Sequence, residues 1–240
     1  MESSMNAQPP KVFYLLAGVA AVLFVCLIVI DVAASVLAGK APTPGSLSSV
    51  EVFALFQSNP FRGFQYLGLL NVIEQMLMLP IVYAFYLSHR QIYKNGSTLV
   101  LLLFATGLAI YIANNVSLPL YSLGQKYGSA AAADKPLLAA AGESLLSRGE
   151  DFTLGALPGF FVNEVSIFVM LALMFKARIF SRISALAGLL GALLLTIFTF
   201  GATLNPSMYN TLMGLSMFGG LLMLAWFIML TLKLFKMAGR

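Results

Sequence analysis

The sequence predicts an all-α integral membrane protein: a six-transmembrane-helix bundle with two short extracytoplasmic amphipathic helices. Of the 240 residues, 60% are hydrophobic and only 10% are charged, whereas soluble domains contain about 25% charged residues. The hydrophobic residues form continuous runs of about 20, which is the length of a membrane-crossing helix and about twice that of a barrel strand. The basic residues fall in short clusters between these runs, as membrane topology signals do.

Six segments are long and apolar enough to cross a bilayer as helices. We expect transmembrane helices at approximately residues 12–38, 64–88, 97–121, 153–175, 183–205 and 208–232. The outer connections then cover residues 39–63 and 122–152, and residues 1–240 form a single membrane domain. The first segment is interpreted as a retained helix, because its apolar run is longer than the about 7 to 15 residues of a signal peptide.

The basic residues predict the orientation of the chain. Nine of them lie on the side of both termini: Lys11, Arg90, Lys94, Lys176, Arg178, Arg182, Lys233, Lys236 and Arg240. Five lie in the long connections on the other side: Lys40, Arg62, Lys126, Lys135 and Arg148. By the positive-inside rule both termini are cytoplasmic and the long connections are extracytoplasmic. Scattered clusters of this kind do not form the basic stripe of a nucleic-acid-binding surface, so we expect no nucleic-acid partner.

Both long connections carry helix signals. Residues 48–59 begin with a capping box formed by Ser48 and Glu51, and the Asn59-Pro60 pair ends the segment. Residues 134–149 begin with Asp134, and Gly149 is a suitable C-terminal cap. Helices of this kind can lie in the membrane interface. Two interpretations stay open: the helices form a lid over the outer end of the bundle, or they only order two connections.

Three acidic residues, Asp31, Glu74 and Glu164, lie inside separate apolar segments that contain no basic residue to pair with them. An ionised side chain at the bilayer centre costs about 2.5 to 3.5 kcal/mol on insertion scales, so such residues indicate a functional site. Helical spacing places other polar residues on the same faces. We therefore predict an outward-facing acidic and amide pocket lined by Glu74, Glu164, Asn71, Asn114, Asn115 and Asn163, with Asp31 near its mouth.

Three interpretations of these polar residues stay open. They hydrogen-bond between helices and only hold the bundle together; they bind or pass a small ligand, cation or proton; or Glu74 and Glu164 act as acid and base of an intramembrane enzyme. The enzyme interpretation is the weakest, because no nucleophile with a partnered base is recognisable, and we predict no catalytic residue. Which metal, if any, the pocket takes stays open.

The single histidine limits cofactor chemistry. His89 cannot by itself supply a bis-histidine haem or a histidine-rich zinc site, and no cofactor is expected. Because Arg90 follows it at the inner end of the second segment, we expect His89 to lie in a solvated cytoplasmic turn.

Small residues in the fifth segment predict close helix packing. Ser184, Gly188 and Ala192 recur at intervals of four, a spacing that lets another helix backbone approach. That helix belongs either to the same chain or to a homo- or hetero-oligomer partner. The lipid bilayer itself is the other expected partner.

The order of features resembles a family of bacterial six-span integral membrane proteins of uncharacterised function. The resemblance lies in the run Phe13–Gly18 in the first segment, in Asn59-Pro60-Phe61-Arg62 before the second, and in Leu137–Leu146 before the fourth. It covers nearly the whole chain and implies a bacterial inner-membrane location. It supplies no activity and no site residues.

The sequence therefore favours a multi-pass membrane protein that binds or passes a small ligand, cation or proton at an outward-facing pocket. The alternative is a structural or accessory subunit of a larger membrane complex with no site of its own.

Overall fold

The computed structural model describes residues 11–37 and 43–239, which fold almost entirely into helices. These are α1 (Lys11–Leu37), α2 (Ser49–Ser58), α3 (Pro60–Tyr66), α4 (Leu69–His89), α5 (Lys94–Asn114), α6 (Ser117–Ser129), α7 (Lys135–Gly149), α8 (Leu157–Ala177), α9 (Arg182–Leu204), the 3₁₀ turn η2 (Pro206–Met208) and α10 (Tyr209–Ala238). Six stretches are long and apolar enough to span a membrane: α1, α4, α5 with α6, α8, α9, and η2 with α10. The predicted all-helical fold with six candidate spans is confirmed. Residues 1–10, 38–42 and 240, which include Lys40 and Arg240 of the charge count, lie outside the described residues.

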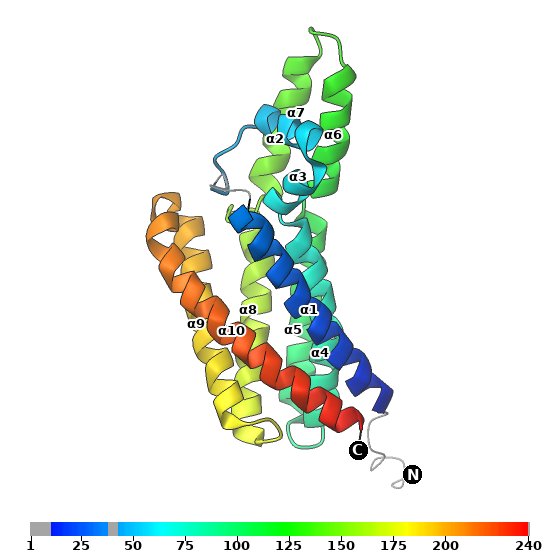
Figure 1. Cartoon of the computed structure of the whole chain (residues 1–240), viewed down its shortest axis with the longest axis vertical. Helices are drawn as coiled ribbons and strands as arrows, with labels where there is room; N and C mark the ends of the chain where they lie inside the picture. The colour runs from blue at the N-terminus through cyan, green and yellow to red at the C-terminus, as the bar shows by residue number, and fades with distance from the viewer. Residues whose placement is uncertain (1–10, 38–42, 240) are drawn as a thin grey trace.

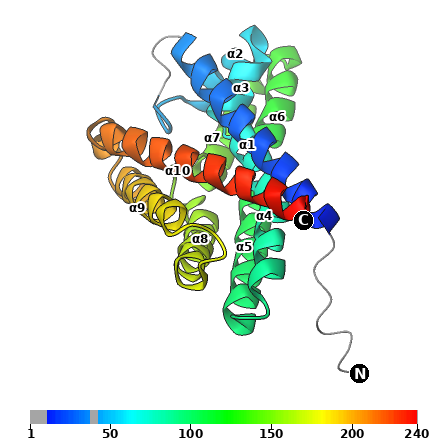
Figure 2. The same cartoon turned by 60° about the horizontal axis from the view of Figure 1, so that its bottom comes forward.

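The six long helices form a ring in which each helix packs against two neighbours. The order around the ring is α1, α4, α5, α8, α9 and α10, and α10 packs back on α1. These first and last helices cross on one face of the bundle (Figure 1; Figure 2). Between them the rings of Phe24 and Phe227 stack with centroids 4.2 Å apart. The start of α1 and the end of α10 lie at the same end of the bundle (Figure 1).

The bundle is apolar on its inside and on its outside. Its main core contains large side chains such as Phe85, Met170 and Trp226. On the outside, Leu102 and Leu190 are 61% and 53% exposed. A helix that is hydrophobic around its whole circumference is stable only where apolar matter surrounds it. The exposed leucines therefore agree with lipid contact around the ring.

A second helical unit, which we call the cap, stands at the end of the bundle away from the chain ends. It consists of α2, α3, α6 and α7 (Figure 1). Its own apolar core contains Val52, Phe53, Phe56, Leu67, Val116, Leu120 and Leu146. The predicted capping box at Ser48 and Glu51 is present, and helices occupy the two predicted segments. α7 runs beside α6 as a hairpin along the long axis, and α2 lies across it (Figure 1). Which side of a membrane the cap occupies stays a prediction.

Two predicted spans are each divided into two helices. The segment 97–121 is broken at Asn115, which has extended backbone geometry and separates α5 from α6. The Oδ1 atom of Asn115 accepts hydrogen bonds from the backbone N–H and the hydroxyl of Ser117, so the side chain caps the start of α6. The segment 64–88 is broken at Gly68, whose φ of 71° is left-handed and suits glycine. Hydrophobicity alone carries no signal for either break.

The expectation that His89 lies in a solvated turn is wrong. Its side chain is fully buried, and its ring stacks on Phe85 at 4.1 Å and on Phe180 at 5.8 Å between centroids. Phe180 belongs to the connection between α8 and α9, which folds over the end of α4. The expectation rested on the charged Arg90 that follows His89. A charged neighbour in the sequence does not determine whether His89 itself is buried.

The small residues of α9 are buried within the chain itself. Ser184, Gly188 and Ala192 are all buried, and a side chain added at Gly188 would meet Leu171 of α8 and Trp226 of α10. These residues thus permit close packing inside the ring. An additional oligomer contact through this helix stays a prediction.

Candidate functional site

Five of the seven predicted polar residues line two separate cavities, which we name the bundle cavity and the cap cavity. The bundle cavity lies inside the ring and has a volume of about 810 Å³. The cap cavity lies where the cap meets the bundle and has a volume of about 200 Å³. Glu74, Glu164 and Asn163 line the first cavity, whereas Asp31 and Asn71 line the second.

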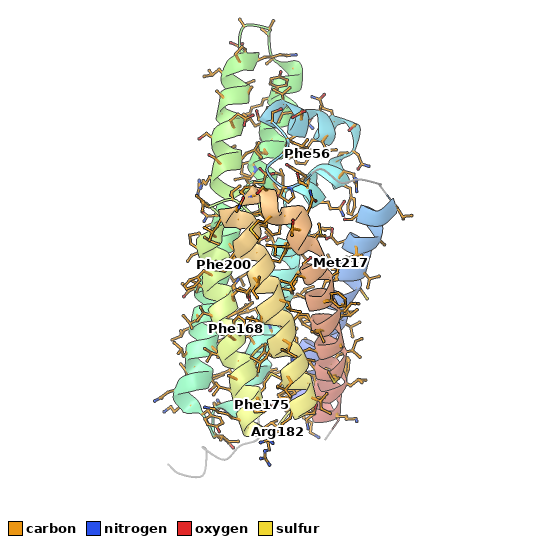
Figure 3. All side chains as sticks on the ribbon, turned by 90° about the vertical axis from the view of Figure 1, so that its left-hand side faces the viewer. Phe56, Phe168, Phe175, Arg182, Phe200 and Met217 are labelled. Atoms are coloured by element: carbon orange, nitrogen blue, oxygen red, sulfur yellow. The ribbon has the colours of Figure 1, made fainter. Side chains whose placement is uncertain are left out.

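The wall of the bundle cavity is mainly apolar. α1 and α10 supply most of this wall, with Phe24, Ile28, Val29, Val32, Ala33, Met213, Met217, Gly220, Leu221, Leu224 and Phe227. Phe24 and Phe227 are the stacked pair described above, so the cavity begins beside the contact between α1 and α10. Met217 and Leu221 are 65% and 64% exposed, and Met217 lies on the part of α10 toward the cap (Figure 3), away from the stacked Phe24 and Phe227. The cavity therefore opens sideways through the wall of the bundle.

Five polar side chains line this apolar space: Glu74 and Gln75 from α4, Asn163 and Glu164 from α8, and Ser216 from α10. The carboxylate of Glu164 accepts a hydrogen bond from the hydroxyl of Thr196 on α9 at 2.9 Å. Asn163 donates to Gln75 at 3.5 Å, and its position depends on Gly107 of α5, where any side chain would overlap its amide. Within residues 11–37 and 43–239, no side chain or backbone group hydrogen-bonds the carboxyl group of Glu74. A carboxyl group without a partner in an apolar wall is a place where a ligand can gain binding energy.

The cap cavity is more polar and carries both signs of charge. Its polar lining is Asp31, Ser35, Arg62, Gln65, Tyr66, Asn71, Asp151 and Tyr209. The amide of Gln65 donates to the Asp31 carboxylate at 2.8 Å and to the Ser35 hydroxyl at 3.0 Å. The Nη1 atom of Arg62 donates to the Gln65 amide oxygen at 3.1 Å and to the Ala34 carbonyl at 3.2 Å. Gln65 thus links the cation on α3 to the carboxylate on α1.

Asp151 is the buried charge of the cap cavity and was not predicted as a site residue. It is 5% exposed; its oxygens accept hydrogen bonds from the Asn71 amide at 2.7 Å and from the Tyr111 hydroxyl at 3.1 Å. Burial raises its pKa to about 6, while the donors Asn71 and Tyr111 act in the opposite direction. Gly68 lies against the carboxylate, and a side chain there would overlap it.

Glu150, the neighbour of Asp151, bonds the connection between α1 and α2 to the junction of the cap and the bundle. It is 3% exposed, and its carboxylate accepts the backbone N–H of Gly45 at 2.7 Å. Burial raises the pKa of Glu150. Burial and the adjacent Glu150 also raise the pKa of Tyr66 above its usual value. The sequence offers one signal for these two acids, which is that they directly precede an apolar segment.

Asn114 and Asn115 line neither cavity. The amide of Asn114 donates to the Gly155 carbonyl at 3.2 Å, and that of Asn115 donates to the Leu67 carbonyl at 3.0 Å. Both bonds join α5 to the connections that lead into the cap. Their place in the structure is the joint between cap and bundle.

The two cavities lie next to each other, and the same three helices line both. α1 contributes Asp31 and Ser35 to the cap cavity and Val32 and Ala33 to the bundle cavity. Asn71 and Glu74, one helical turn apart on α4, line one cavity each. α10 repeats the pattern through Tyr209 in the cap cavity and Met213 in the bundle cavity. Since one turn of helix rises about 5.4 Å, the two spaces are immediate neighbours.

No family model matches this chain, and no curated protein or solved structure matches it either. The resemblance to the bacterial six-span family therefore stays a prediction. Across the described residues, no group of three or more His, Cys, Asp or Glu side chains is placed to hold a metal ion. The geometry of the two cavities is the remaining source of functional inference.

Proposed function

We propose that this protein is a multi-pass membrane protein that binds a small amphipathic ligand in the bundle cavity. The observation that carries the proposal is that Glu74 and Glu164, from different helices, line one mainly apolar cavity of about 810 Å³. The ligand has an apolar body and a group that donates hydrogen bonds or carries positive charge. Ligand cavities typically measure about 300 to 1,000 Å³ and combine apolar walls with a few polar groups.

The sideways opening supports entry from the lipid. Met217 and Leu221 at the opening are apolar and exposed, which suits a ligand dissolved in a bilayer. In the orientation proposed from the basic residues, both termini are cytoplasmic and the cap is extracytoplasmic. We place the protein in a bacterial inner membrane, with the cavity in the outer half of the bilayer.

The test compares an amine with an alcohol of equal chain length. Dodecylamine and dodecanol are each added to the purified full chain, and the melting temperature is measured. A ligand at about 100 times its Kd stabilises by about 2.7 kcal/mol, which corresponds to roughly 5 °C or more for a chain of this size. We expect dodecylamine to raise the melting temperature of the wild type by this amount and dodecanol to raise it less.

The variants identify the groups responsible. In the double variant Glu74→Gln, Glu164→Gln the advantage of the amine over the alcohol disappears. Glu51→Gln is the matched control, because Glu51 lies in the cap and glutamine also serves in a capping box. Equal stabilisation of wild type and double variant by dodecylamine would overturn the proposal.

The alternative function is a structural or accessory subunit of a larger membrane complex. The hydrogen bonds from Thr196 to Glu164 and from Asn163 to Gln75 favour it, because they join neighbouring helices as a purely structural network does. In that case the double variant loses stability without ligand, and the response to dodecylamine does not change.

A further inference from the structure

The cap cavity is a second polar space that the proposed function does not use. It combines two carboxylates, Asp31 and Asp151, with one guanidinium, Arg62. A ligand that satisfies such a lining carries a positive group for the carboxylates and a negative group for the guanidinium. The mixed charge distinguishes this space from the bundle cavity, whose charged side chains are both acidic.

The three charged side chains have capacity for additional hydrogen bonds. Asp151 accepts one bond at each oxygen from Asn71 and Tyr111, and a carboxylate can accept about four. The bonds that the Arg62 guanidinium donates to described residues both leave from Nη1, while a guanidinium has five N–H donors. The Oδ1 atom of Asp31 accepts one bond from Gln65.

The level of the cap cavity matches that of lipid headgroups. Asn71 lies in the first turn of α4, Tyr209 begins α10, and Asp31 lies in the last third of α1. Ends of membrane-spanning helices reach the headgroup layer, whereas the interior of the spans lies in hydrocarbon. The adjacent bundle cavity shares the level of Val32 and Ala33 on α1 and extends from there to interior positions such as Phe24, Met78 and Ile167. The polar space therefore lies at the depth of a headgroup, and the apolar space lies at the depth of acyl chains.

We infer that the two cavities together bind one zwitterionic aminophospholipid of the phosphatidylethanolamine class, with its headgroup in the cap cavity and an acyl chain in the bundle cavity. The primary ammonium group binds Asp31 and Asp151, and the phosphate binds Arg62, since guanidinium groups pair well with phosphate. This assignment rests on the proposed function, because it takes the bundle cavity as the site of the apolar body.

The test is a competition between two lipids with identical acyl chains. The purified full chain is incubated with equal amounts of dioleoyl phosphatidylethanolamine and dioleoyl phosphatidylglycerol, free lipid is removed, and the retained lipids are quantified. The glycerol headgroup has the phosphate but lacks the ammonium. We expect about ten-fold preferential retention of phosphatidylethanolamine, the ratio that one charge-assisted hydrogen bond provides.

Single substitutions test the binding of the ammonium group and of the phosphate group separately. Asp31→Asn and Asp151→Asn each lower the preference for phosphatidylethanolamine over phosphatidylglycerol. Arg62→Gln lowers retention of both phospholipids and leaves the response to dodecylamine unchanged, because that amine has no phosphate. Asp134→Asn, a change of the same kind in the cap outside both cavities, keeps the wild-type preference.

Three outcomes overturn the inference. The first is equal retention of the two lipids by the wild type. The second is a preference that survives both Asp31→Asn and Asp151→Asn. The third is displacement of the retained lipid by millimolar phosphoethanolamine, which would indicate a soluble ligand with the same chemistry. In each case the dodecylamine test of the bundle cavity can still succeed, so failure of this inference is distinguishable from failure of the proposed function.

Discussion

At the scale of single residues, Asp151 shows how burial couples this fold to pH. Its pKa rises from an ordinary value of 3.8 to about 6 when the protein folds. The folded protein therefore holds this proton more tightly than the unfolded chain does. The resulting stabilisation is complete below pH 3.8 and is lost as the pH rises through about 6. A difference of this size corresponds to about 3 kcal/mol at most.

We expect the free energy of unfolding of the wild type, minus that of Asp151→Asn, to increase as the pH falls from 7 to 4. Asparagine does not titrate, so the variant lacks this contribution. Glu150, whose pKa burial also raises, is present in both proteins, so its contribution largely cancels in the difference. Denaturation of both proteins in the same detergent across this range measures the difference. A constant difference would contradict the assignment.

Position 68 requires glycine for two reasons, its backbone conformation and the lack of space for a side chain. The contribution of each to stability can be measured separately. The φ of Gly68 is 71°, and a side chain at this position would overlap the Asp151 carboxylate. Gly45 has a similar φ of 76° but has open space around it. Gly45→Ala should therefore cost only the left-handed strain, about 1 kcal/mol. Gly68→Ala should cost at least about 1 kcal/mol more, because an overpacked side chain adds to the strain. Equal losses of thermal stability in the two variants would show that the space at Gly68 is unimportant.

At the scale of elements, α10 offers a matched pair of glycines for testing the bundle cavity. A side chain added at Gly220 or at Gly214 meets open space, but only Gly220 lines the cavity. Replacing either by leucine gains about 1 kcal/mol of helix propensity. We expect Gly220→Leu to occupy the cavity and to reduce the stabilisation by dodecylamine, while Gly214→Leu leaves it unchanged. The melting temperature with and without the amine is the measurement. If both leucine variants keep the full response, the amine binds elsewhere.

The helices were largely predictable from the sequence, whereas the breaks that divide two of the predicted spans were not. The first and fifth predicted spans differ from α1 and α9 by one residue at each described end, because long apolar runs determine membrane helices. The break at Gly68 depends on one left-handed residue, and the break at Asn115 depends on the hydrogen bonds of one side chain. The capping box at Ser48 was predictable because it is local in sequence.

At the scale of the whole molecule, the prediction of one polar pocket was incomplete. Glu74, Glu164 and Asn163 line one cavity, whereas Asp31 and Asn71 line another. Asp151 could not be predicted, because its burial depends on Asn71 and Tyr111, which are 80 and 40 residues away. Asn114 and Asn115 share a helical face with Tyr111, but the end of α5 directs them to the cap. Charge and spacing in the sequence identify the polar side chains that are energetically unfavourable in a membrane. The packing of the folded chain determines which of these side chains line the same cavity.

The contact between α1 and α10 also sets an order of events in time. Of the six ring helices, α1 leaves the ribosome before the others and α10 after them, yet the two are neighbours in the ring. Until α10 is made, α1 has only α4 beside it, and the wall carrying Met213, Met217 and Gly220 does not exist. A chain that stops short of its last helix thus has the glutamates but no enclosed space around them. The bundle cavity is completed only after α10 has been made.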